Sequence, residues 1–262
     1  MRCFVVALLL GTCFAGTGLA GAGAQAADIA AHRAHYDLHL ERGRGDVVAA
    51  SGTMDFEITD ACDAWAVRQR LRMQLTGRDG TESNMLSDYT TLESKDGGRL
   101  RFQLRQTNDG QVSEEIQGVA TLSATGGEAK YTLPEVATKT LPAGTLLPMA
   151  HTNAVLTAAA SGQKFVAVPL FDGTSADGAQ NSTIVVASWD KAGKSDRPEL
   201  AGIASGRVRI AFFNRESGAP QAEYEVGMRY FENGVADEMS MDFGDFVMAA
   251  KMTQLSVAKP GC

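Results

Sequence analysis

The sequence predicts an all-β protein, built as one large antiparallel sheet or open barrel that packs against a single short helix. Two observations lead to the β class. Apolar residues alternate with polar ones at a period of two along most of the chain, and glycine-containing turn signals separate these runs at hairpin spacing. A third observation adds the helix, because one segment alone breaks the two-residue period.

The first 26 residues have the features of an export signal. The stretch 3–27 carries no charge, and its apolar part, residues 4–10, is followed by small residues that end in Ala24-Gln25-Ala26. This ending matches the A-x-A pattern that signal peptidases cleave. We therefore predict cleavage after Ala26, which leaves residues 27–262 as a single soluble domain in the periplasm. A β fold of this length commonly forms one domain, and no Pro- or Ser-rich linker divides it.

Two alternatives to a cleaved signal remain open. The uncharged stretch is long enough to cross a bilayer, which takes ~20 residues, although glycines between Gly11 and Gly23 interrupt it. Cys13 follows Leu10-Gly11-Thr12, which loosely resembles a lipid-modification box, although apolar sequence continues beyond it. A cleaved signal fits these features best, so we expect no stable membrane anchor.

The net charge argues against one class of partner. The whole chain carries a net charge of −7 at pH 7, and signal cleavage removes one basic residue, Arg2. Nucleic acids and anionic membranes attract proteins through clustered Lys and Arg. We therefore expect no nucleic-acid partner and no charge-based binding to a membrane.

Alternating runs predict about a dozen antiparallel strands, each with one buried and one solvated face. The clearest runs are residues 54–58, 65–75, 100–105, 208–212 and 224–230. Gly, Asn and Asp tolerate the positive φ angles of tight turns, so five turn signals predict hairpins. These are Arg78-Asp79-Gly80, Asp96-Gly97-Gly98, Asn108-Asp109-Gly110, Thr125-Gly126-Gly127 and Asn233-Gly234. In the last strands the apolar parity shifts across Gly244-Asp245, which predicts a bulge.

Residues 148–161 are predicted to form the one short helix. Pro148 suits the first helical position, alanines fill the interior, and Gly162 suits the residue that ends a helix. A dozen strands and one helix predict a curled sheet or open barrel that packs against this helix.

Two cysteines remain after signal cleavage, Cys62 and the C-terminal residue Cys262. In an oxidising compartment, one intramolecular disulfide is the simplest interpretation of such a pair. For a loop of this length the chain-entropy model predicts roughly 5 kcal/mol of stabilisation. Two free or intermolecular thiols remain the alternative.

The histidines do not predict a metal site. On a helix His35 and His39 would share a face and could bind zinc, but the surrounding alternation marks a strand, which separates the two imidazoles by ~13 Å. His151 falls one turn into the predicted helix, where it could face the loop at Asp172 and Gly173. Packing within the helix is one interpretation of His151, and a polar group at a pocket mouth is the other.

No catalytic or cofactor-binding signature is complete in this sequence, so we predict a protein that is not an enzyme and needs no cofactor. Ser161-Gly162-Gln163-Lys164 and Ser188-Trp189-Asp190-Lys191 match the S-x-x-K motif of serine acyltransferases. The S-D-N and K-T-G motifs that should accompany it are missing. The carboxylate pair of a glycosidase converges only in space, so a hydrolase of cell-wall glycans stays as a further hypothesis.

Methionines gather in the last predicted strands, at Met228, Met239, Met241, Met248 and Met252. Methionine fills cores, and it also lines adaptable apolar grooves. The core is the simpler interpretation, and a groove for a lipid or peptide is the functional one.

Several short segments occur in a recognisable order along nearly all of the mature chain. They are Tyr36-Asp37-Leu38, Cys62-Asp63-Ala64-Trp65, Leu141-Pro142-Ala143-Gly144-Thr145 with Pro148 and His151, Leu170-Phe171-Asp172-Gly173, Asn233-Gly234-Val235, Asp242-Phe243-Gly244-Asp245-Phe246 and Cys262. In this order they resemble the EipB-like family of periplasmic cell-envelope integrity proteins. Two departures occur: Asp242-Phe243-Gly244 stands where Tyr-Gly is more usual, and the tail after Pro260 is very short.

The resemblance implies a many-stranded β-spiral or broken barrel, a disulfide between Cys62 and Cys262, and a part in envelope maintenance. It also implies a functional link to a periplasmic tetratricopeptide-repeat protein. The family has no established catalytic residues, so none are assigned. The leading hypothesis is a non-enzymatic factor that supports envelope integrity by binding a periplasmic protein, peptide or lipid. A lipid or lipoprotein carrier of the open-barrel type is the second hypothesis.

Overall fold

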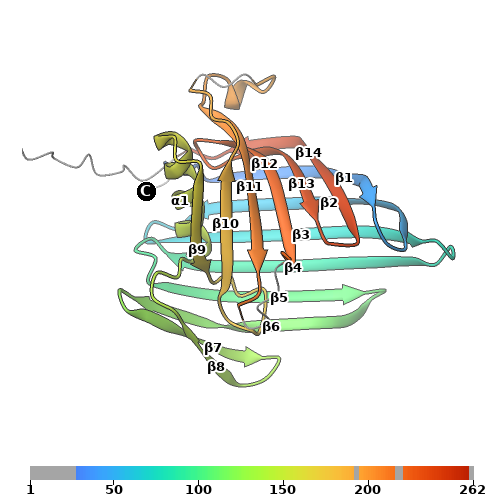
Figure 1. Cartoon of the computed structure of the whole chain (residues 1–262), viewed down its shortest axis with the longest axis horizontal. Helices are drawn as coiled ribbons and strands as arrows, with labels where there is room; N and C mark the ends of the chain where they lie inside the picture. The colour runs from blue at the N-terminus through green and yellow to red at the C-terminus, as the bar shows by residue number, and fades with distance from the viewer. Residues whose placement is uncertain (1–27, 192–194, 216–220, 260–262) are drawn as a thin grey trace, which may run out of the picture.

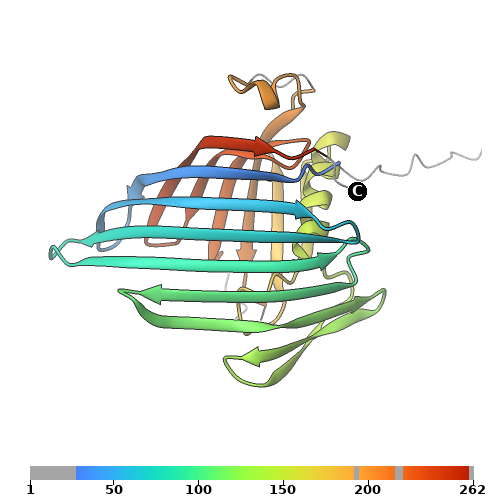
Figure 2. The same cartoon turned by 180° about the vertical axis from the view of Figure 1, so that it is seen from behind.

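The computed structural model describes residues 28–191, 195–215 and 221–259. The predicted export signal, which includes Cys13, and the predicted disulfide partner Cys262 lie outside these described residues. Within them the chain forms fourteen β-strands, one α-helix and one short 3-10 helix (Figures 1 and 2). The all-β class is confirmed, with two strands more than the dozen predicted.

The strands fall into two groups of consecutive hairpins, separated by the α-helix. The first group is β1 (His32–Gly43), β2 (Val47–Asp60), β3 (Ala64–Gly77), β4 (Glu82–Ser94), β5 (Arg99–Asn108), β6 (Gln111–Ser123), β7 (Gly126–Leu133) and β8 (Ala137–Leu141). The second group is β9 (Phe165–Leu170), β10 (Gln180–Val186), β11 (Ser205–Phe213), β12 (Tyr224–Phe231), β13 (Ala236–Asp242) and β14 (Phe246–Val257). The helices are α1 (Pro148–Ser161) and η1 (Pro198–Leu200).

All fourteen strands belong to one antiparallel sheet, whose order runs from β8 down to β1 and then from β14 down to β9. The first and last strands therefore pair in its middle, and we call the β1–β14 pairing the terminal seam. The strands β8 and β9 form the two ends of the sheet, so it is open rather than closed. The two groups of strands cross each other in Figure 1, which shows how the curled sheet folds over itself.

The inner and outer faces of the sheet separate as the alternation predicts. In β5, Leu100, Phe102 and Leu104 are buried, and the residues between them are exposed. The outer face carries a row of charges in which each residue stands opposite the next on six successive strands. The row is His35, Asp55, Arg70, Asp88, Arg105 and Glu115. Opposite charges across strands favour this register, since a slip of one residue would turn them toward the core.

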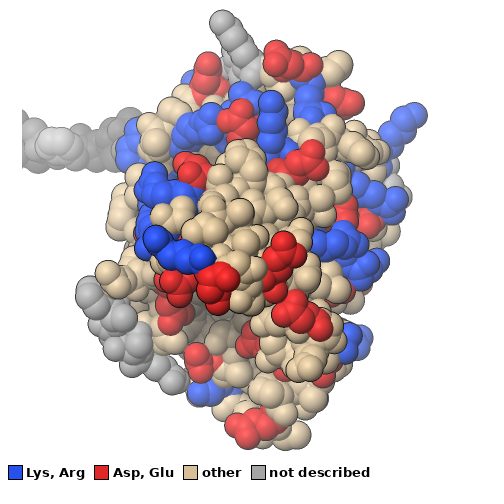
Figure 3. Space-filling model, turned by 90° about the vertical axis from the view of Figure 1, so that its right-hand side faces the viewer, with Lys and Arg blue, Asp and Glu red and all other residues tan. Residues whose placement is uncertain are grey.

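Contacts along this row join neighbouring strands in pairs. His35 Nδ1 lies 2.6 Å from Asp55 Oδ1, Arg70 Nη2 donates to Asp88 at 2.9 Å, and Arg105 Nε donates to Glu115 at 2.8 Å. Charges of both signs also interleave on the face that lies to the right in Figure 1 (Figure 3). That face therefore presents a mixed surface and not a continuous basic patch, in keeping with the net charge.

The helix begins and ends at the predicted residues. Pro148 occupies the first turn, and Gly162 ends the helix in the left-handed conformation with φ 81°. Gln163 N donates to the Ala158 carbonyl at 2.9 Å, which satisfies one of the carbonyls that a helix end exposes. None of the helices in the described residues is both long and apolar enough to span a membrane.

The five predicted hairpin turns are present, with positive φ at Gly80, Gly97, Gly110, Gly126 and Gly234. The bulge predicted at Gly244-Asp245 is wrong. These residues form the turn between β13 and β14, where Gly244 has φ 88° and Phe243 N donates to the Phe246 carbonyl at 3.0 Å. The apolar parity shifts there because the chain reverses direction, not because one strand gains a residue.

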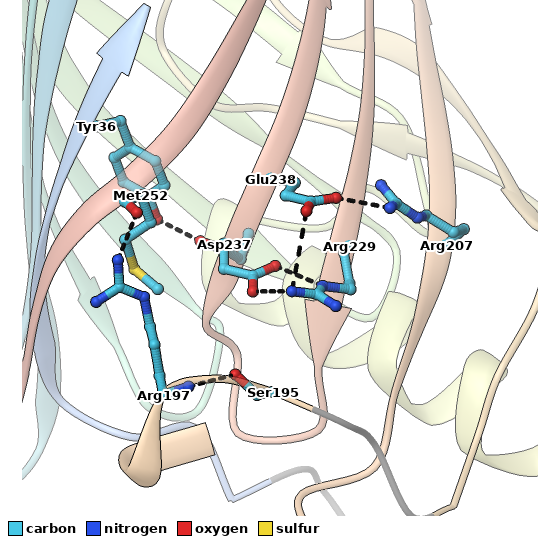
Figure 4. Close-up of polar contacts among 9 residues, drawn as sticks. Tyr36, Ser195, Arg197, Arg207, Arg229, Asp237, Glu238 and Met252 are labelled. Atoms are coloured by element: carbon cyan, nitrogen blue, oxygen red, sulfur yellow. Dashed lines mark hydrogen bonds and ion pairs between the residues drawn. The ribbon is translucent and has the colours of Figure 1, made fainter. Parts of the chain in front are cut away.

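Side chains from distant parts of the chain fasten the terminal seam. Tyr36 of β1 is 2 % exposed, and its hydroxyl donates to the Ala236 carbonyl at 2.6 Å, across β14. Arg197, which precedes η1, donates to the carbonyl of Met252 in β14. Figure 4 shows Tyr36 and Arg197 beside Met252, the residue paired with Tyr36 in the seam. The seam thus joins β1, β13, β14 and the loop that contains η1.

Replacing Tyr36 by Phe should lower the free energy of unfolding by about 1–2 kcal/mol, because the variant loses a buried hydrogen bond. Urea denaturation of the two proteins measures this difference. Ser240→Ala is the matched control, since Ser240 Oγ donates to Glu41 across the same region at 2.8 Å but at an exposed position. We expect its effect to stay within about 0.5 kcal/mol. Equal losses in the two variants would contradict this account of the seam.

Candidate functional site

A cavity of about 270 Å³, partly open to solvent, lies between the two groups of strands, next to the start of α1, and we call it the interior cavity. The walls come from β1 to β4 on one side and from β12 and β13 on the other, so neither group of strands forms the cavity alone. Five methionines line it: Met54, Met149, Met228, Met239 and Met241. Three of these are among the methionines singled out in the sequence. The other two, Met248 and Met252, are buried in the core at 0 % and 2 % exposure.

Four tyrosines also line the cavity: Tyr36, Tyr89, Tyr224 and Tyr230. The hydroxyls of Tyr36 and Tyr89 donate to the carbonyls of Ala236 and Asp172, at 2.6 Å and 2.5 Å. Burial raises the pKa of all four phenols above the ordinary tyrosine value. The tyrosines therefore stay protonated near neutral pH and act as uncharged donors.

Glu93 of β4 positions the helix beside the cavity. The residue before the helix, Leu147, has no side chain that can cap the first turn, and the turn contains no acidic residue. The Glu93 carboxylate takes the place of the missing cap. It accepts hydrogen bonds from Met149 N at 2.7 Å and from Ala150 N at 3.0 Å. A carboxylate also interacts favourably with the positive end of the helix dipole.

Burial and hydrogen bonding act in opposite directions on Glu93, which is 1 % exposed. Burial raises the pKa to about 7, and the two backbone amides partly offset this rise. Met149 carries one of these amides, and its side chain lines the cavity. Glu93 therefore acts on the cavity through the helix backbone.

His151 lies in α1, and it is not among the residues that line the interior cavity. Its Nε2 is 2.7 Å from Ser182 Oγ of β10, and the two residues are 5 % and 1 % exposed. Burial lowers the pKa of His151 to about 4, so the imidazole is neutral at physiological pH. A Ser–His contact of this length resembles a nucleophile with its base, but burial gives a substrate no access. The pair instead joins the helix to β10.

Asp172 and Gly173 form a tight turn, and neither residue lines the cavity. Asp172 Oδ1 accepts from Thr174 N at 3.0 Å, and its backbone carbonyl accepts from Tyr89, a lining residue. Gly173 has φ 75°, and a Cβ there would lie 2.4 Å from the Phe102 ring. The structure thus places these two residues in a packed corner, connected to the cavity through Tyr89. His151 bonds to β10, so the three candidate residues do not form one cluster.

His35 and the serines of the S-x-x-K segments also have structural partners. His35 contacts Asp55 on the outer face, and the described residues contain no group of three or more His, Cys, Asp or Glu that could hold a metal ion. Ser161 Oγ donates to the Ala158 carbonyl at the end of α1, and Ser188 Oγ accepts from Arg207 N. Each serine therefore stabilises local backbone.

The chain is similar to a known protein family and to proteins from Brucella abortus. The model of the EipB-like family matches residues 23–259. The chain is 29 % identical to the cell envelope integrity protein EipB of Brucella abortus (strain 2308), over 95 % of this chain and 92 % of that protein. The crystal structure of a beta-barrel-like protein of domain of unknown function DUF1849 from Brucella abortus superposes with a TM-score of 0.81. That match has 27 % identity and covers 89 % of this chain and 100 % of that one.

Replacing Glu93 by Gln should change how stability depends on pH. The ordinary pKa is 4.5 and the folded value is about 7, so the folded protein holds this proton more tightly than the unfolded chain. The stabilising contribution of Glu93 is therefore full below pH 4.5 and falls as the pH rises through 7, by up to about 3 kcal/mol.

The measurement is the difference in unfolding free energy between wild type and Glu93→Gln at pH 4.5, 6 and 8, and we expect it to shrink with rising pH. Taking the difference cancels the contribution of His151, whose lowered pKa acts with the opposite sign. That contribution is lost as the pH falls from 6.5 through about 4. A difference that grew with pH would show that burial does not dominate at Glu93.

Proposed function

This chain belongs to the EipB-like family, and we propose that it is a periplasmic protein that supports cell-envelope integrity by binding rather than by catalysis. The match to EipB over 95 % of the chain carries this proposal. The export signal predicted for residues 1–26 supports the location. The curled sheet, with an apolar interior cavity and a mixed-charge outer face, supports binding as the mode of action.

The binding partner is proposed on two separate grounds. A periplasmic tetratricopeptide-repeat protein is the proposed protein partner, and the family resemblance alone supports it. An apolar ligand inside the sheet is the second candidate, and the cavity lined by methionines and tyrosines supports it. A carrier of lipids or lipoproteins would use such a cavity.

We also propose the disulfide between Cys62 and Cys262. Cys62 lies in the turn between β2 and β3, with φ 68°. His32 of β1 pairs with Ile58 of β2 on one side and with Val257 of β14 on the other, so the ends of β2 and β14 lie two strand spacings apart, ~10 Å. The four residues from Lys259 to the C-terminus can span ~13 Å, which is enough to reach Cys62. The bond would close the end of the terminal seam.

Deleting the gene should increase sensitivity to detergents and to cell-wall antibiotics, because an envelope factor is lost. Growth on plates with graded detergent and β-lactam measures the effect, and a plasmid copy of the wild-type gene should restore resistance. A copy that lacks residues 2–26 is the control, since it encodes residues 27–262 without the predicted export signal. Unchanged sensitivity after deletion would remove the proposed envelope role.

Cys62→Ser and Cys262→Ser should each lower the free energy of unfolding by about 2–5 kcal/mol, as expected for loss of one disulfide. The double variant should lose no more than either single variant, because both substitutions break the same bond. Denaturation of periplasmic protein without reductant measures these values, and wild type with dithiothreitol should match the variants. Additive losses, or none, would show that the two cysteines are not paired.

A further inference from the structure

We propose that the interior cavity binds a single acyl chain through an uncharged carbonyl group, an ester or an amide, which Gln69 and Thr91 recognise. This inference rests on the second candidate of the proposed function, an apolar ligand inside the sheet. It specifies the chemistry of that ligand and the residues that distinguish it.

Gln69 breaks the apolar inner row of β3. The side chains on the same face before and after it are Val67 and Leu71, which are both buried. Its cross-strand neighbours are Phe56 of β2 and Tyr89 of β4. Gln69 lines the cavity, and within the described residues its carboxamide makes no hydrogen bond to the protein. Gln69 is half-buried, so its amide is reachable from the cavity and is free to bind a polar group of a ligand there.

Thr91 adds a second polar group to the same wall. It lies on β4, opposite Val67 and diagonal to Gln69, and it is 6 % exposed. Diagonal neighbours in a sheet are ~7–8 Å apart at Cα, so both side chains can reach one ligand group placed between them. In the described part of the chain the Thr91 hydroxyl also has no hydrogen-bond partner. Every fully buried side-chain N or O atom in that part has a partner, so the open groups of Gln69 and Thr91 face the cavity.

The charges around the cavity favour an uncharged ligand. Its lining, as the described residues define it, contains no Lys, Arg, Asp or Glu. Burial lowers the pKa of the one lining histidine, His32, which keeps it neutral. A carboxylate would lose its hydration here without gaining a cation. A carbonyl oxygen needs only the donors that Gln69 and Thr91 carry.

The size and lining of the cavity favour one acyl chain. Its volume is about 270 Å³, just below the ~300–1,000 Å³ of most ligand pockets. A cavity of this volume is too small for a lipid with two chains. Methionine side chains are flexible and polarisable, so the five that line the cavity can adapt to chains of different length. Ordered water is the alternative occupant that would satisfy Gln69.

Ligand titration tests this inference with the mature wild-type protein and two neutral variants. Displacement of a fluorescent acyl probe gives the Kd for 1-decanoylglycerol and for decanoate at pH 7.5. Wild type should bind the neutral ester at least about tenfold more tightly than the carboxylate. Gln69→Leu and Thr91→Val should each weaken binding of the ester by about tenfold. Gln74→Leu, on the outer face of the same strand, should leave both affinities unchanged.

Thermal denaturation without ligand provides a second measurement. Gln69→Leu should raise the Tm, because it replaces an unpartnered amide by an apolar side chain of similar size. A lower Tm would show that Gln69 is structural and would overturn the proposal. A higher Tm with unchanged ester affinity would overturn it too, and would indicate that Gln69 holds only water.

The ligand results also separate this inference from the broader one. If neither wild type nor any variant binds 1-decanoylglycerol or decanoate, and native mass spectrometry finds no co-purifying lipid, an apolar ligand is excluded altogether. If all variants bind the ester equally, recognition by Gln69 and Thr91 is wrong, although the cavity still binds acyl chains. If decanoate binds as tightly as the ester, the proposed preference for an uncharged carbonyl group is wrong.

Discussion

The pairing of β1 with β14 is the contact on which the rest of the structure depends. In the described sheet it is the only strand pairing that joins the two groups of hairpins. Every other strand pair joins neighbours in the sequence, whereas this one joins residues 32–43 to residues 246–257. Closing so long a loop has an entropic cost before any contact compensates for it. The hydrogen bonds of Tyr36 and Arg197 at this seam help to offset that cost.

The cavity exists because of that seam. Tyr36 and Met54 belong to the first group of strands, and Met239 and Met241 belong to the second. These side chains face a common space only when β1 and β14 are paired. The start of α1 borders the space, and Glu93 fixes that start by accepting hydrogen bonds from two amides of the helix. The seam therefore sets the walls of the cavity, and Glu93 sets its end.

Local patterns in the sequence predicted the elements but not their arrangement. Alternation in residues 65–75 and 100–105 identified β3 and β5, and Pro148 with Gly162 identified α1 to the residue. The signal at Gly244-Asp245 was misinterpreted, because a bulge and a tight turn produce the same shift in the alternation of apolar and polar residues. The seam and the role of Glu93 depend on contacts between residues far apart in the chain, which no local pattern contains. Gln69 did leave a signal, as the one polar residue among the inward positions of its strand.

Polar residues that face inward are of two kinds. Those with a protein partner stabilise the fold, and those without one are candidates for ligand binding. Glu93, His151 and Tyr36 all have protein partners, so packing and hydrogen bonding explain why they are buried. Gln69 and Thr91 face the cavity without one in the described residues. The fully buried polar side-chain atoms of the described residues all have partners, so a polar group left without one lies where the cavity can reach it. A residue that only stabilised the sheet at position 69 would be apolar, like Val67 and Leu71 beside it. The amide is therefore best explained by what the cavity binds.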